Sequence, residues 1–562
     1  MPAPPRAAAA SLGGQPAARP HGTEWTIAAI LVAAGLAAPV LVVLSSLLSP
    51  RGEIWRHLWR TQLAELLLNT LALLAGVAGG TLLVGTVLAW LVVHYRFPGR
   101  DLFEWALILP LAVPAYVIGF AFLGLFEFAG PVQTALRRLF GPGVRLPELR
   151  SWGGVVLMMT LVFYPYVYLL ARAAFREQGS AAVETARSLG RSPTRAFLEV
   201  TLPLARPSLA AGVALAMMEA LADFGTVATF GYRTLTEGVY RVWYGMFDRI
   251  AASQLAAVLL LFSAALLWLE RASRGRRRFV QRPRHGPEAA PVTLRGVRAL
   301  AAFAACGGVL GLAFALPVGQ LVVWAAQAVR AGRVTPTFPA LLANTLALAS
   351  VAALAACAVA VTLAYALRLH PAPATRAASR LASLGYALPG AVIAVGVLIP
   401  LAALDRSLVP LLERLLGRPL GLLFTGSAVG LVYAYLVRFM AVSLQTVEAS
   451  LTRIPPSLDD AARALGVSAR GALRRVHLPL LRGGLATALV LVFVETMKEM
   501  PATLLLRPFG LNTLAIEVWE HTSEAMWQEA AVPALAIVVA GLGPVLLVMR
   551  WSRLPVSRGE DP

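Results

Sequence analysis

The chain has 562 residues, of which 58% are hydrophobic and only 14% are charged. Soluble globular proteins are nearer a quarter charged, so this composition excludes an ordinary soluble protein and indicates a polytopic membrane protein. The formal net charge is +20, and every basic side chain except Lys498 is an arginine. The arginines lie in short loops between apolar runs, where they orient membrane helices, so the charge does not predict nucleic-acid binding.

Twelve apolar runs are long enough to span a bilayer, six in each half of the chain. The first run is too long for a signal-peptide core, so we expect it to remain as a helix. The runs of the first half are 25–48, 66–94, 102–127, 152–175, 207–230 and 252–270. Those of the second half are 299–328, 342–368, 379–404, 423–446, 483–507 and 531–550. The sequence therefore predicts an all-α membrane protein of two parallel six-helix repeats.

The domain organisation follows from these runs. We expect a disordered tail at 1–24, a first half at 25–270, a basic linker at 271–298, a second half at 299–550 and a C-terminal tail at 551–562. The linker is the most arginine-rich stretch of the chain. Because arginine in short loops favours the cytoplasmic side, the linker and both termini are predicted to be cytoplasmic.

The residues that usually carry catalysis or bind metals form no recognisable constellation. Cys306 and Cys357 both lie inside apolar runs, which argues against a disulfide framework or a cysteine metal cluster. The histidines are scattered and lie mostly in loops. No phosphate-binding loop of the Gly-x-x-x-x-Gly-Lys-Ser/Thr type occurs. We therefore expect no catalytic residue, no cofactor and no ATP site in this chain.

One polar segment occurs twice, at 184–203 and again half a chain later at 460–479. In each copy an acidic residue is followed by alanine, then by Leu-Gly, then by Leu-Pro. Gly190 and Gly466 allow the left-handed backbone that ends a helix, and Ser192 and Ser468 can cap a second short helix. The pattern predicts helix, sharp turn, helix, a shape suited to docking in the cleft of a partner. An incidental hairpin is the alternative, but it would not recur at the same depth in both halves.

This pattern resembles the EAA signature of permease subunits of bacterial ABC importers. Thr185 and Asp460 depart mildly from that signature, where alanine and glutamate are usual. The resemblance implies a bacterial inner-membrane protein whose partners are a dimer of ABC ATPases, which would bind ATP, and a periplasmic substrate-binding protein. The residues expected to couple to the ATPase are Glu184, Ala186, Gly190, Ser192, Arg195, Pro203, Asp460, Ala462, Gly466, Ser468, Arg470 and Pro479.

Ionisable residues also recur in the predicted fifth and eleventh helices, near the middle of the bilayer. Glu219 and Asp223 are four residues apart and are expected to share a helix face, as are Glu495 and Glu499. Lys498 supplies a positive charge beside them. Charged groups at this depth normally face a cavity or a partner. Two interpretations stay open: the carboxylates line a cation path, or they pair with Lys498 and nearby arginines to shape packing or a gate.

The surroundings of these carboxylates resemble the ferric-iron permeases of the same superfamily, above all in the run 496–503 followed by Leu506-Arg507-Pro508. The resemblance extends over nearly the whole chain and implies ferric iron as cargo. Tyr164, Tyr166 and Tyr168 also match; they could ligate iron, although tyrosines near a proline more often pack. Thiamine, polyamine or phosphonate cargo, and a proton-coupled secondary transporter, are the alternatives.

Overall fold

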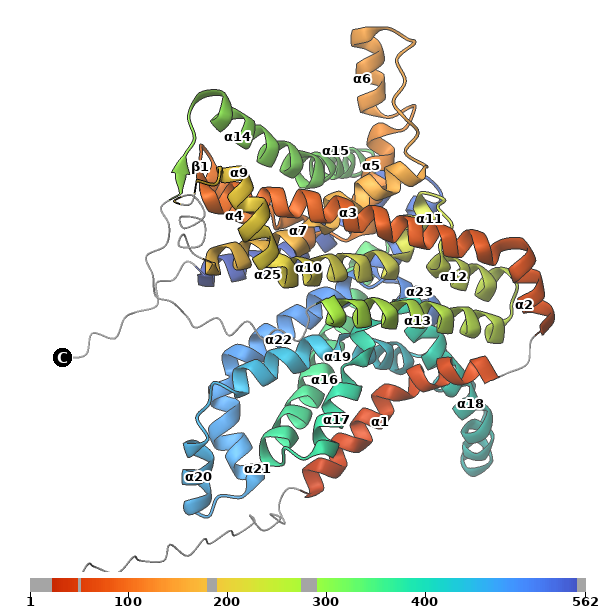
Figure 1. Ribbon diagram of the computed structural model, residues 1–562. Helices are drawn as coiled ribbons and strands as arrows, with labels where there is room; N and C mark the ends of the chain where they lie inside the picture. Colours follow the sequence, from red (N-terminus) through yellow and green to blue (C-terminus); the bar gives the residue numbers. More distant parts are fainter. Residues whose placement is uncertain (1–22, 49–51, 179–187, 189, 274–290, 553–562) are drawn as a thin grey trace, which may run out of the picture.

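The computed structural model describes residues 23–48, 52–178, 188, 190–273 and 291–552, which form a bundle of long helices (Figure 1). The expected N-terminal tail, apart from its last two residues, and most of the linker and C-terminal tail lie outside this part of the chain. Within the described part, eleven helices are long and apolar enough to cross a membrane. One further helix, α25, is apolar over Trp527–Gly543. The all-α polytopic fold class is therefore confirmed.

The two halves contain similar elements in the same order. The helices of the first half are α1 (Thr23–Ser45), α2 (Gly52–Leu58), α3 (Ala64–His94), α4 (Arg100–Ala106), α5 (Ala115–Phe126), α6 (Pro131–Phe140), α7 (Trp152–Glu177), α9 (Pro193–Ala196), α10 (Leu202–Ala222), α11 (Phe224–Thr229), α12 (Leu235–Gly245) and α13 (Arg249–Ser273). Those of the second half are α14 (Gly296–Leu310), α15 (Leu316–Arg330), α16 (Phe338–Leu369), α17 (Pro373–Ala382), α18 (Gly390–Leu416), α19 (Ala428–Leu451), α20 (Ser457–Ala464), α21 (Ala469–Ala472), α22 (Leu478–Lys498), α23 (Pro501–Leu506), α24 (Leu514–Ser523) and α25 (Trp527–Ser552).

Several of these helices join end to end through a π-helical turn. The turn Trp59–Leu63 joins α2 to α3, and the turn Gly311–Ala315 joins α14 to α15. The same device precedes the fifth membrane helix of each half, at Phe197–Thr201 and Leu473–His477. Each turn inserts one residue without breaking the helix, so the following side chains are rotated around the axis.

Prolines divide two of the predicted membrane helices. The run 102–127 is broken by a 3₁₀ turn at Leu109–Ala112, and α5 begins only after Pro114. In the second half α18 begins after Pro389 in the same way. Proline lacks an amide donor and disfavours helical backbone in the residue before it, so a continuous helix cannot form there.

The predicted fifth and eleventh helices end earlier than expected, which corrects the proposal that their carboxylates share one helical face. Helix α10 ends at Ala222 and α22 ends at Lys498. Asp223 and Glu499 therefore lie at a break, in extended backbone conformations. The Asp223 carboxylate accepts a hydrogen bond from the Thr226 backbone amide (2.9 Å) and so caps α11. Glu499 accepts one from the Ala502 amide (2.8 Å) at the start of α23.

The first helix of each half packs on the opposite half. Helix α1 lies against α16, α17 and α18 of the second half (Figure 1). Helix α15 lies against α5 of the first half and also against α25 of its own half. Gly396 permits the close approach of α1, because a Cβ atom there would lie 2.4 Å from the Pro39 carbonyl oxygen. The two-residue strands β1 (Tyr95–Arg96) and β2 (Val292–Thr293) pair in parallel and fix the start of α14 beside the end of α3. The two halves are thus interlocked around a central interface.

Candidate functional site

A cavity of about 110 Å³ lies between the halves, around the breaks that follow α10 and α22. The structure brings to its wall all five residues that the sequence singled out as path candidates: Glu219, Asp223, Glu495, Lys498 and Glu499. The ends of α10 and α22 place them there, since both helices converge on the interface from opposite halves.

A second cavity of about 40 Å³ adjoins the first and shares Glu219 and Glu495 with it. Its wall includes Leu215 and Met218, which precede Glu219 along α10. Because α10 begins beside the short helix α9, this second cavity leads from the carboxylates toward the α9 end of the molecule.

The carboxylates contributed by the second half are neutralised by cations of the same half. Lys498 Nζ lies 2.7 Å from Glu495 Oε1, and Arg438 Nε lies 3.0 Å from Glu499 Oε2. Arg438 comes from α19 and also donates a hydrogen bond to the Leu388 carbonyl oxygen (3.2 Å). The sequence reasoning missed Arg438, although a lone arginine inside an apolar run is itself a signal.

The carboxylates of the first half have no cation of their own half on the cavity wall, and Glu219 instead feels Arg438 and Lys498 from across the interface. Asp223 accepts hydrogen bonds from the amide and the hydroxyl of Thr226 (2.9 and 2.5 Å). The cations that line the cavity, Arg438 and Lys498, both come from the second half. The lining therefore carries four carboxylates and two cations, and both cations come from the second half.

Tyrosines surround the cavity in two different roles. Tyr164 and Tyr168 are buried and donate hydrogen bonds to the carbonyl oxygens of Leu107 (2.9 Å) and Glu104 (2.8 Å), so they pack α7 against the α4 region. Tyr166 lines the cavity, and so does Tyr116 of α5. Tyr116 is 7% exposed, and its hydroxyl has no hydrogen-bond partner within the described residues. The sequence reasoning did not single it out.

No group of three or more His, Cys, Asp or Glu side chains is placed to hold a metal ion in the described part of the chain. In this conformation the cavity carboxylates are too dispersed for a resident metal centre. A cation entering the cavity would meet a few oxygen donors and water.

Aromatic side chains join the two halves beyond the helix breaks. The ring centroid of Phe224, at the start of α11, lies 4.5 Å from that of Tyr240 in α12 and 5.1 Å from that of Trp519 in α24. Tyr244 donates a hydrogen bond to the Leu504 carbonyl oxygen (3.2 Å) across the two halves. The short helices α12 and α24, which the sequence reasoning missed, therefore join the halves at this end.

The repeated polar segments form two elbows, here defined as residues 190–201 (first elbow) and 457–477 (second elbow). Figure 1 shows α9 and α20 on separate arms at the same end of the molecule. Gly190 and Gly466 have φ angles of 82° and 72°, so both turns adopt the left-handed backbone that the sequence predicts. Both glycines are exposed, and a Cβ atom at either would meet nothing within 4 Å.

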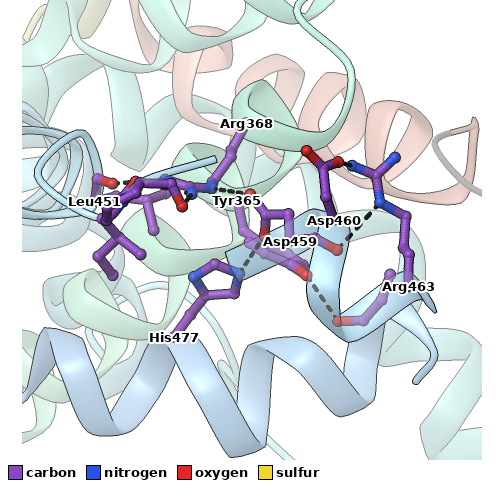
Figure 2. Close-up of polar contacts among 10 residues, drawn as sticks. Tyr365, Arg368, Leu451, Asp459, Asp460, Arg463 and His477 are labelled. Atoms are coloured by element: carbon purple, nitrogen blue, oxygen red, sulfur yellow. Dashed lines mark hydrogen bonds and ion pairs between the residues drawn. The ribbon is translucent and has the colours of Figure 1, made fainter. Parts of the chain in front are cut away.

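The second elbow is held by a polar network centred on Asp459 (Figure 2). Arg368 Nε lies 2.8 Å from one carboxylate oxygen of Asp459, and His477 Nε2 lies 2.6 Å from the other. Arg368 also donates hydrogen bonds to the carbonyl oxygens of Leu451 (2.7 Å) and Ile454 (3.0 Å). His477 is fully buried. A single arginine of α16 thus fixes both the end of α19 and the start of α20.

The predicted coupling residues of the second elbow are mostly on its surface. Asp460 pairs with Arg463, and Arg470 pairs with Glu24 at the start of α1 (3.2 Å), where both side chains are exposed. Ala462 is buried, and Pro479 is the second residue of α22. Ser468 accepts a hydrogen bond from the Gly471 amide (3.2 Å) and caps α21, as expected.

The first elbow is described only from Gly190 onward, apart from Ser188, so Glu184 and Ala186 lie outside the described residues. Ser192 accepts a hydrogen bond from the Arg195 amide (3.4 Å). Arg195 is exposed, and Pro203 is the second residue of α10.

Aromatic packing replaces the polar network in the first elbow. The ring centroid of Trp90 in α3 lies 3.4 Å from that of His94, 4.3 Å from that of Phe197 and 5.8 Å from that of Phe175. The two elbows therefore share a backbone shape and differ in what holds them.

Comparison with known proteins agrees with this two-fold organisation. The family described as binding-protein-dependent transport system inner membrane component matches residues 81–278 and again residues 356–558. The chain is 28% identical to the Fe(3+)-transport system permease protein FbpB 2 of Haemophilus influenzae over 498 residues, which is 88% of this chain and 91% of the relative.

Shorter relatives match one half of the chain. The sulfate transport system permease protein CysT of Escherichia coli is 32% identical over 189 residues, 33% of this chain and 66% of the relative. The molybdenum transport system permease protein ModB of Escherichia coli is 29% identical over 228 residues, 39% of this chain and 96% of the relative.

Proposed function

Because the chain belongs to the family of binding-protein-dependent transport system inner membrane components, we propose that it is the fused permease of an ABC importer that carries ferric iron. Both halves of the permease are then present in one polypeptide. The relative that matches nearly the whole chain is a ferric-iron permease, which supports this cargo. No catalytic residue and no cofactor are assigned to this chain.

The charge balance of the cavity is the observation that carries the choice of cargo. A sulfate or molybdate ion would need free cationic donors, but Arg438 and Lys498 are already paired with Glu499 and Glu495. Glu219 and Asp223 remain as unbalanced carboxylates, which favour a cation. Carboxylate oxygens are hard donors and suit a hard cation such as ferric iron.

The proposed mechanism is alternating access driven by a separate ATPase. A dimer of ATPase subunits would bind ATP and contact the two elbows on the cytoplasmic side, where both termini would also lie. Closure of that dimer would draw the two arms together and move α10 and α22 relative to each other, since each elbow continues directly into one of these helices. A substrate-binding protein would deliver iron at the opposite end, next to α12 and α24.

A cargo panel tests this proposal. Proteoliposomes that contain this chain, its ATPase and its binding protein would be supplied with ATP and with labelled ferric iron, sulfate, molybdate or thiamine. We expect accumulation of iron alone. Accumulation of one of the other three solutes without iron would overturn the cargo and leave the importer class standing.

A further inference from the structure

The two halves line the central cavity with different side chains at positions related by the repeat. Ser151 caps α7 and Ser427 caps α19, so these two serines occupy equivalent positions and fix the correspondence between the helices. In this register Arg438 corresponds to Val162, which also lines the cavity. Lys498 corresponds in the same register to Ala222, so both cations of the wall belong to the second half.

The phenol on the opposite wall has no counterpart either. Pro114 precedes α5 as Pro389 precedes α18, and aligning these two prolines pairs Tyr116 with the buried residue Ala391. The Tyr116 hydroxyl is buried and has no hydrogen-bond partner among the described residues, an arrangement that is costly for the apo protein. Tyr116 thus brings an unpartnered oxygen to the wall that also carries Glu219 and Asp223.

We propose that Tyr116, Glu219 and Asp223 form a transient site for a hard multivalent cation on the first-half wall, while the second-half wall is a charge-balanced framework. This inference rests on the proposed function and names the residues that serve it. All three side chains line one cavity and offer oxygen donors. Glu495 and Glu499, the repeat counterparts of the two carboxylates, are engaged by Lys498 and Arg438.

The limited number of donors suits transit. Two carboxylates and one phenol leave coordination positions for water, and the cavity of about 110 Å³ has room for it. Conduction requires that a cation binds well enough to enter and weakly enough to leave. Within the described residues no metal cluster of three or more His, Cys, Asp or Glu side chains competes with this site.

Terbium binding tests the site directly and independently of transport. Tb³⁺ is a hard trivalent cation whose luminescence is sensitised by a nearby phenol, so it would be titrated into the purified chain in nanodiscs. Y116F removes a hydroxyl without a protein partner, E219Q removes one charge, and D223N keeps an oxygen that can cap α11. We expect each variant to weaken terbium binding by about tenfold, the loss of one charged contact.

Control variants separate this effect from packing. Y164F removes a hydroxyl that is bonded to Leu107 and E237Q alters a carboxylate paired with Arg241 in α12, so both should keep the terbium affinity. The charge-neutral double variant E495Q/K498M is the sharper comparison, because it changes the second-half wall alone. It should also keep the affinity, and a tenfold loss there would contradict the division between the walls.

Iron uptake by the same variants in proteoliposomes separates the site from the cargo. Loss of terbium binding together with loss of iron transported per ATP hydrolysed supports the whole proposal. If terbium binding depends on the three residues but the wild-type protein transports no iron, the cation site is supported and ferric iron is rejected as the cargo. If the wild type takes up iron, and both the terbium affinity and the iron uptake are unchanged in Y116F, E219Q and D223N, the proposed cation site is wrong and the proposed transport function stands.

Discussion

The two halves of the chain have similar helices in the same order, yet different interactions hold their equivalent parts. The second elbow is held by a partly buried polar network around Asp459, whereas the first is held by aromatic packing around Trp90. At the cavity the second half pairs its carboxylates with its own cations, and the first half does not. The backbone of a repeat can thus be kept while its two copies take on separate tasks.

The largest effect is expected from placing a charge on either elbow turn. G190D and G466D should abolish transport while membrane insertion is retained, because the new side chain points into open space on the docking surface and causes no internal clash. Uptake of iron and the amount of chain in the membrane would both be measured.

The controls for these variants are G190N and G466N. Asparagine tolerates the left-handed backbone and brings no charge, so these variants should keep more activity than the aspartates. If the aspartate variants transport normally, the elbows are not the sites of coupling.

A second large effect should be confined to the second elbow. R368M would leave the carbonyl oxygens of Leu451 and Ile454 without their donor and would leave Asp459 with His477 as its remaining partner. We expect a cost of about 3 kcal/mol for breaking a largely buried ion pair. The melting temperature of the purified chain and its co-purification with the ATPase would report the loss.

The matched position in the first half is Val93 of α3, because aligning the repeated Asn-Thr-Leu-Ala-Leu runs at 69–73 and 344–348 pairs it with Arg368. V93A should lower stability by only about 1 kcal/mol, the amount expected for deleting part of a half-buried apolar side chain. Equal losses in R368M and V93A would argue that the two elbows are held in the same way.

A smaller effect should follow from making the first-half wall resemble the second. A222K places a lysine at the position equivalent to Lys498, three residues after Glu219, so it should neutralise that carboxylate. We expect the rate of iron uptake to fall by about tenfold, which is the effect of losing one charged contact with the cation. A222M has a similar length and no charge, and should lose less; equal losses in both variants would assign the effect to bulk.

The smallest effect concerns the caps of the short helices α12 and α24, which join the two halves. Thr234 and Thr513 each accept a hydrogen bond from an amide in the first turn of α12 and α24. T234A and T513A should each lower the free energy of unfolding by about 1 kcal/mol. Because this feature is the same in both halves, denaturant unfolding should give similar values. A difference of several kcal/mol would show that the halves differ here too.

The long helices could be predicted from the sequence because a bilayer requires about 20 apolar residues in succession. The breaks could not be predicted from hydropathy. Residues 207–230 are apolar apart from a few polar side chains such as Glu219 and Asp223, yet the backbone turns at Asp223. The sequence signal for this break was local: Asp223 lies three residues before Thr226, and its carboxylate caps α11 by accepting a hydrogen bond from the Thr226 amide. Helices α12 and α24 were missed because each has only about ten residues and is half polar.

The candidate site was predicted in part. The repeated carboxylates and the position of Lys498 in a membrane helix marked the cavity, because ionisable groups at that depth are rare. Arg438 carries the same kind of signal and was overlooked. Tyr116 could not be found, because a tyrosine in an apolar run resembles any packing residue until the structure shows its hydroxyl without a partner.

The most direct test of the account is the energy source for iron uptake. The initial rate of labelled ferric iron uptake into proteoliposomes with the ATPase and the binding protein would be measured with ATP, with a non-hydrolysable analogue, and with ATP plus a protonophore. The account predicts uptake that requires hydrolysable ATP and is unaffected by the protonophore. Uptake that continues without ATP and collapses with the protonophore would contradict it and indicate a proton-coupled transporter.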